Sequence, residues 1–153
     1  MRVRKYFLLI LAALGLTAVV LGLIWFLRPG DPADALFSRW NLSRPERAKT
    51  LYAVQTEDRW FGEGEAWVVL RLDTGPSEAG WHWDYALQAD GEPAQAMRES
   101  VEEIAGHLSV PEEYRLDWSE EMFWCALRRD DGGSLFLLWR PEQSWLYLAD
   151  SIF

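Results

Sequence analysis

The residues best suited to chemistry in this sequence are two neighbouring aromatic rings with charged residues on both sides. Trp60 and Phe61 lie in a glycine-containing stretch between two strand-like segments, with Arg59 before them and Glu63 after them. Large apolar groups in such a turn are difficult to bury and usually mark a contact surface, while a guanidinium and a carboxylate add directional polar contacts. The pattern predicts a binding site formed by these four residues. The alternative is that Trp60 folds back over the sheet as a lid on the core.

Acidic residues occur in close pairs, and a glycosidase needs two carboxylates on opposite sides of the bond that it cleaves. The pairs are Glu57/Asp58, Glu63/Glu65, Glu112/Glu113, Glu120/Glu121 and Asp130/Asp131. Trp118 lies among such residues, where its ring could stack on a sugar or contact a protein. Solvated acidic faces are the ordinary explanation in an acidic domain. A cell-envelope glycan-acting enzyme that uses paired carboxylates is therefore the alternative function rather than the favoured one.

No residue pattern indicates a nucleophile, a metal or a cofactor. His82 and Asp84 share one face of a strand-like segment, but the HxH and HExxH spacings of metal sites do not occur. His107 falls at the end of a predicted helix, where a cation favours the helix dipole. Cys125 is the one cysteine, and its place in a predicted strand indicates a buried free thiol. We therefore expect no catalytic residue, no metal ligand and no cofactor.

Charge is distributed unevenly along the 153 residues, which carry a formal net charge of -9. Residues 1–30 hold four basic side chains and no acidic one, whereas residues 31–153 hold 11 basic and 24 acidic side chains. An acidic domain lacks the basic face that nucleic acid needs, but its field can attract a basic protein. The expected partners are a basic protein or a cell-envelope glycan, and not nucleic acid.

An uncharged, mostly aliphatic run covers residues 6–27. As a helix it would reach about 33 Å, close to the hydrocarbon thickness of a bilayer. Three basic residues precede the run and one, Arg28, follows it. This asymmetry predicts a single-pass anchor with a cytoplasmic N-terminus and the C-terminal domain outside. The alternative is a signal peptide cleaved after Ala35, although signal peptides usually have an apolar region of only about 7–15 residues.

Hydrophobic periodicity in the rest of the chain predicts both helices and strands. Apolar residues three and four apart, from Ala94 through Val101 to Leu108, indicate an amphipathic helix. Asp31 followed by Pro32 is typical of a helix start, and alternating apolar and polar residues indicate strands. The predicted helices cover 31–40 and 93–107, and the predicted strands cover 49–57, 65–73, 81–87, 122–128, 134–139 and 144–149.

These elements predict an α+β fold, with an antiparallel sheet of five or six strands and one main amphipathic helix. Residues 135–139 (LFLLW) are apolar on both faces, so we expect their strand to be central in the sheet and covered on both sides. Tryptophans at alternate strand positions are expected in the core. The predicted organisation is a cytoplasmic stub (1–5), a transmembrane helix (6–27), a short helix and linker (28–47), and an acidic α+β domain (48–153).

Two segments give the chain a resemblance to a loose group of small exported or membrane-anchored bacterial proteins with a compact α+β domain. They are TLYAVQTEDRWFGEGEAWVVLRLD (50–73) and SLFLLWRPEQSWLYLADSIF (134–153). In that group a hairpin with a glycine-containing turn opens the domain, and an aromatic-rich hairpin closes it. The resemblance implies location and fold, and it carries no activity and no catalytic residues. The sequence thus predicts a non-enzymatic, membrane-anchored, extracytoplasmic binding domain.

Overall fold

The computed structural model describes residues 15–17, 19–20, 31–56, 64–73 and 92–152. The chain divides into two compact units, Met1–Gly30 and Asp31–Phe153. In the first unit, the described residues are helical and expose the apolar side chains of Leu16, Val19 and Val20. Most of the predicted span over 6–27 lies outside the described residues. Within those residues, no helix has both the length and the apolar character needed to cross a membrane.

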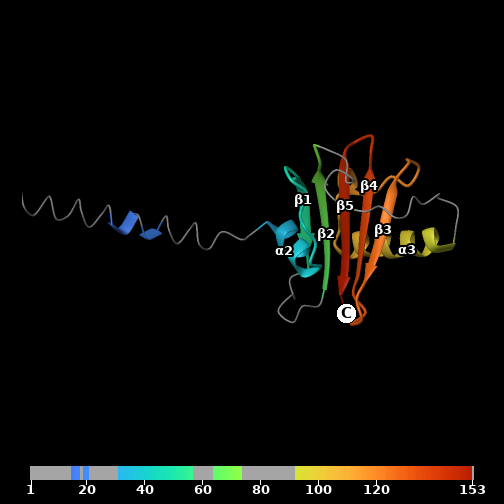
Figure 1. The fold of residues 1–153 in the computed structure, drawn as a ribbon, viewed down its shortest axis with the longest axis horizontal. Helices are drawn as coiled ribbons and strands as arrows, with labels where there is room; N and C mark the ends of the chain where they lie inside the picture. Colours follow the sequence, from blue (N-terminus) through green and yellow to red (C-terminus); the bar gives the residue numbers. More distant parts are fainter. Residues whose placement is uncertain (1–14, 18, 21–30, 57–63, 74–91, 153) are drawn as a thin grey trace, which may run out of the picture. The chain divides into compact units, whose positions relative to one another are not determined.

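The second unit is built on a five-stranded antiparallel sheet, which confirms the α+β class (Figure 1). Its strands are β1 (Lys49–Gln55), β2 (Gly64–Arg71), β3 (Phe123–Arg128), β4 (Ser134–Arg140) and β5 (Trp145–Ile152). The predicted hairpin of the first two strands and the predicted meander of the last three are both present. The sixth candidate, segment 81–87, lies outside the described residues.

The strand order is β1-β2-β5-β4-β3, so the middle of the sheet is β5 and not the apolar β4. The expectation that β4 is covered on both sides is confirmed, because β4 is an inner strand and residues 135–140 are buried, but β5 rather than β4 takes the middle position. The reason is that burial on both faces is required of every inner strand and does not distinguish among them. The middle position follows instead from the pairing of β2 with the C-terminal strand, from Gly64 opposite Ile152 to Arg71 opposite Trp145.

A short helix, α2 (Pro32–Arg39), covers one face of the sheet and begins as predicted. The side chain of Asp31 accepts a hydrogen bond from the backbone N–H of Ala33 at 3.0 Å, which caps the helix. Leu36 and Phe37 are buried against the sheet residues that face this helix. The α2-side core includes Val68, Leu70, Leu135, Leu137, Leu146 and Leu148.

The long helix α3 (Glu92–His107) covers the opposite face, and its predicted apolar stripe is confirmed at the described side chains. Met97, Val101, Ile104 and Leu108 are all buried in the α3-side core, together with Trp67, Val69 and Tyr147 of the sheet. The helix is stopped by Ser109, which has φ 51°, and by the Val110 N–H bonding back to the Ala105 carbonyl at 2.9 Å. The two helices thus enclose the sheet from both sides.

Two of the four tryptophans on the described strands lie in the core, as expected from their alternate positions. Trp67 and Trp139 are buried, on the α3 side and the α2 side respectively. Trp124 and Trp145, on β3 and β5, are only partly buried at the border of the α3-side core. These two rings are therefore available to line hollows on that face.

Candidate functional site

The four residues of the predicted contact site, Arg59, Trp60, Phe61 and Glu63, lie outside the described residues. The same holds for His82 and Asp84 and for segment 81–87 in which they stand. The role of this loop as a contact site stays a prediction. The first described residue after the loop is Gly64, which has φ 124° and pairs with Ile152 at the end of β5.

An open hollow of about 590 Å³ lies between the segment that follows α3 and the β4–β5 turn. The segment contributes a 3₁₀ turn, η2 (Glu112–Tyr114), and the residues up to Glu120. We call this hollow the acidic–aromatic groove. Its lining comprises Glu112, Glu113, Arg115, Leu116, Asp117, Trp118, Glu120, Arg140, Gln143 and Trp145.

Trp118 is fixed in this groove by contacts with α3. Its Nε1–H donates to Glu102 Oε1 at 2.5 Å, and the guanidinium of Arg98 lies 5.2 Å from the ring centroid. A polar tip bonded at one end leaves an amphipathic ring with a defined position. Trp118 was singled out by the sequence, and the structure places it in a concave surface.

Trp145 is positioned by a row of aromatic rings on the α3 face of the sheet. Tyr52 and Tyr114 stack with their centroids 4.6 Å apart, Tyr114 lies 6.4 Å from Trp145, and Trp145 lies 6.1 Å from Tyr147. The first three rings of this row are only partly buried, whereas the ring of Tyr147 is fully buried. Rings packed in this way form a rigid wall, because each is held by its neighbours.

The two arginines of the groove are already engaged with protein groups. Arg140 is 4% exposed, forms an ion pair with Glu120, and donates from Nη1 to the Tyr147 hydroxyl at 3.4 Å. Arg115 donates from Nε to the Val110 carbonyl at 2.8 Å. Both guanidinium groups of the groove therefore already bind other groups of the fold.

The acidic groups of the groove are more accessible. Glu112, Glu113 and Asp117 are exposed. The pKa of Asp117 lies below its usual value because the Ser119 hydroxyl and backbone N–H donate to it, at 2.6 and 3.0 Å, with a smaller contribution from the charge of Arg140. The pKa of Tyr52 is raised, by burial first and then by the charge of Glu113. The groove therefore presents anionic groups beside two aromatic rings.

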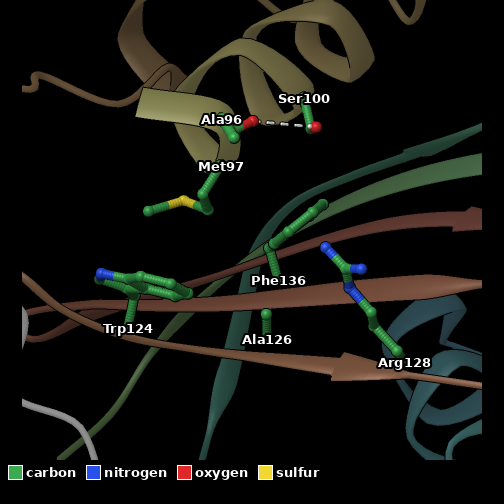
Figure 2. Close-up of a pocket in the computed structure, with 7 residues that line it drawn as sticks. All are labelled: Ala96, Met97, Ser100, Trp124, Ala126, Arg128 and Phe136. Atoms are coloured by element: carbon green, nitrogen blue, oxygen red, sulfur yellow. Dashed lines mark hydrogen bonds between the residues drawn. The ribbon is translucent and has the colours of Figure 1, made fainter. Parts of the chain in front are cut away.

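A second, smaller hollow of about 170 Å³ lies between α3 and the edge strand β3 (Figure 2). Trp124, Ala126 and Arg128 alternate along β3 and face the helix, and Met97 projects from α3 above Trp124. Phe136 of β4 lies between Trp124 and Arg128 in the view. A cavity of about 150 Å³ is large enough for one benzene ring, so this hollow has the size of a single apolar group.

Two further groups of chemical interest have structural explanations. Asp150 is fully buried and accepts from Arg39 Nη1 at 3.1 Å and from Trp40 Nε1 at 2.9 Å, which joins β5 to the end of α2. Cys125 packs with Phe123 and Leu127 against the α2-side core. It is half-buried, and burial raises the pKa of its thiol, the opposite of what a reactive cysteine needs.

No cluster of three or more His, Cys, Asp or Glu side chains suited to a metal ion occurs within the part of the chain that the structure describes. No family model, curated protein or solved structure matches the chain. The function must therefore be argued from the geometry of the second unit.

Sequence reasoning found Trp118 and the carboxylates Glu112, Glu113 and Glu120 of the groove but missed Trp145 and Arg140. Both come from the β4–β5 hairpin, 22 or more residues further along the chain. Their approach to Trp118 depends on how the segment after α3 crosses the end of the sheet. The sequence did contain a signal for Arg140, which directly follows the apolar segment 135–139. A charged residue at the end of such a strand needs a partner when it is buried.

Proposed function

We propose that this protein is a membrane-anchored, extracytoplasmic binding domain whose acidic–aromatic groove receives a basic segment of another protein. The observation that carries the proposal is the lining of the groove, in which two partly buried tryptophans lie beside exposed carboxylates. Carboxylates pair with Lys or Arg, and aromatic faces attract the same cations. No enzymatic step is required by this arrangement.

The charge balance of the second unit supports a basic partner. Residues 31–153 carry 13 more acidic than basic side chains, and such a field accelerates the approach of a cationic protein. Arg140 pairs with Glu120, and Arg115 donates to a backbone carbonyl. The other carboxylates of the groove can therefore bind cations of a partner. A neutral or anionic partner would gain nothing from this field.

The location is proposed from the sequence, with support from the few described residues of the span. Leu16, Val19 and Val20 expose 67%, 59% and 45% of their surface on a helical segment. Exposed aliphatic side chains of this kind are costly in water and favourable in lipid. With three basic residues before the run and one after it, the second unit belongs on the outer side.

The proposal predicts that binding of a basic peptide depends on the groove carboxylates. The full chain in non-ionic detergent micelles is titrated by calorimetry with a peptide of alternating Lys and Gly. Replacing Glu112 and Glu113 together by Gln should weaken binding about fivefold, because two exposed ion pairs contribute on the order of 1 kcal/mol in total.

The matched control replaces Glu99 and Glu142 by Gln, which changes the net charge equally at exposed positions outside the groove lining. This variant should bind within twofold of the unaltered chain. Equal losses of peptide affinity in the two double variants would mean that the peptide responds only to overall charge. The groove would then not be the binding site.

A glycan-acting enzyme is the second candidate, because carboxylates and tryptophan rings line the same hollow and such enzymes use both. Incubation of the full chain with soluble cell-wall oligosaccharides separates the two functions. The binding domain predicts no new reducing ends, whereas release of reducing ends that is abolished by Glu113→Gln or Asp117→Asn would establish the enzyme.

A further inference from the structure

A row of polar side chains crosses the sheet on its α3 face, at the end where β2 begins and β5 ends. Glu65 of β2 pairs with Ser151 of β5, and Ser151 pairs with Ser134 of β4. Alternation places all three on the side of α3, because Trp67, Tyr147 and Phe136 on the same strands belong to the α3-side core. The row therefore lies beneath the last turns of the helix.

These three residues line a hollow of about 110 Å³ that is separate from the acidic–aromatic groove. Its other walls are Ser100, Glu103 and Ile104 of α3 and Phe136 of β4. The hollow is smaller than the cavity of about 150 Å³ that holds a benzene ring. It has room for one side chain rather than for a drug-sized ligand.

Glu65 is a buried carboxylate without a permanent cation beside it. The residue is 8% exposed, and among the described residues its side chain has one partner, His107 Nδ1 at 3.2 Å. Histidine is a cation only when it is protonated, and a buried carboxylate normally has an oppositely charged partner. The carboxylate of Glu65 therefore has no permanent positive charge beside it to offset the cost of its burial.

Ser151 adds a second, independent indication of a ligand. It is 6% exposed, and its Oγ has no hydrogen-bond partner among the described residues. Buried hydroxyls are nearly always bonded, and an orphaned one is destabilising. Its place between Glu65 and Ser134 points this acceptor at the same hollow.

We infer that this hollow receives a lysine side chain of a protein partner. Ile104 and Phe136 form apolar walls for the methylene stem. The ammonium group has three donors, which match the Glu65 carboxylate and the hydroxyls of Ser151 and Ser134. The inference extends the proposed function by naming the group bound at a second site.

The test uses the full chain in non-ionic detergent micelles and Nα-acetyl-lysine methylamide as the probe, with backbone amide shifts as the readout. Binding should shift the amides of Ser134 and Ser151. Glu65→Gln should weaken probe binding at least tenfold, the effect of one charged hydrogen bond. Ser151→Ala should weaken it severalfold without loss of stability, because no bond within the fold is removed.

The control variant Glu142→Gln, outside the hollow, should bind the probe as the unaltered chain does. The neutral probe Nα-acetyl-norleucine methylamide should bind at least tenfold more weakly than the lysine probe. Equal binding of the two probes, unchanged affinity in Glu65→Gln, or tighter binding of free cadaverine than of the lysine probe would overturn the inference. Each result is independent of the groove, which the Glu112 and Glu113 variant tests separately.

Discussion

At the scale of single residues, Asp150 shows how the fold holds a charge in its interior. The carboxylate is fully buried in the middle strand, and both oxygens accept hydrogen bonds from the end of α2, from Arg39 and from the Trp40 indole. These bonds offset the cost of removing the charge from water. Arg39 and Trp40 precede Asp150 by 111 and 110 residues, so the contact couples the beginning of the unit to its end.

Removal of this carboxylate should be strongly destabilising. Asp150→Ala is expected to lower the free energy of unfolding by about 3 kcal/mol, because it leaves the buried indole N–H and the partly buried guanidinium without an acceptor. Denaturant unfolding of the full chain in micelles measures the change. Asp130→Ala, at an exposed turn position, should stay within about 0.5 kcal/mol of the unaltered protein, and a similar small change in Asp150→Ala would contradict this role.

Single-residue roles could be predicted from the sequence where they depend on local alternation. Cys125 was expected to be a buried thiol in a strand, and it packs with Phe123 and Leu127 against the α2-side core, where it is half-buried. The orphaned hydroxyl of Ser151 and the pairing of Arg140 with Glu120 could not be predicted in this way. Both depend on the register of strands and loops that are distant in the sequence.

At the scale of elements, Arg44 holds the start of α2 against β1. Its Nη1 donates to Asp31 at 2.7 Å and to Asp34 at 2.6 Å, and its Nη2 donates to the Ala48 carbonyl and the Thr50 hydroxyl, each at 3.0 Å. Burial alone would raise the pKa of Asp31, but hydrogen bonds from Thr50, Arg44 and the Ala33 backbone lower it below its usual value. The helix cap and the strand are thus joined through one guanidinium.

This arrangement predicts a sensitivity to acid that depends on Arg44. Because the pKa of Asp31 is lower in the folded state, its contribution to stability is present above the ordinary value of 3.8 and is lost as the pH falls through the folded value. Arg44→Met should lower the free energy of unfolding by about 1–2 kcal/mol at pH 6, and by less at pH 2.

The control Arg71→Met removes an exposed arginine at the end of β2 and should have little effect at either pH. Unfolding curves at the two pH values measure both variants. A loss in Arg44→Met that is equally large at pH 2 would mean that the residue acts through packing alone.

The elements themselves were largely predictable, whereas their order in the sheet was not. Periodicity depends on neighbours a few residues apart, so it located both helices and the five described strands. The pairing of β2 with β5 brings together residues that are about 80 positions apart. No local pattern in either strand encodes that choice, which places β5 rather than β4 in the middle.

At the scale of the whole molecule, the proposal joins three features: a basic N-terminal end, an apolar run and an acidic unit with a groove. The first two predict where the acidic unit lies, and the third predicts what it contacts. The most direct test places a photo-crosslinking amino acid at Gln143, an exposed residue of the groove lining, or at Ser38, an exposed residue of α2.

Crosslinking is carried out in intact cells that produce the full chain, followed by protease added from outside. We predict a discrete adduct when the crosslinker is at Gln143 and no such adduct when it is at Ser38. Replacing Glu112 and Glu113 by Gln should reduce the amount of this adduct. The added protease should degrade it. The same adducts from both positions, or an adduct that the protease cannot reach, would contradict a groove that binds its partner on the outer face of the membrane.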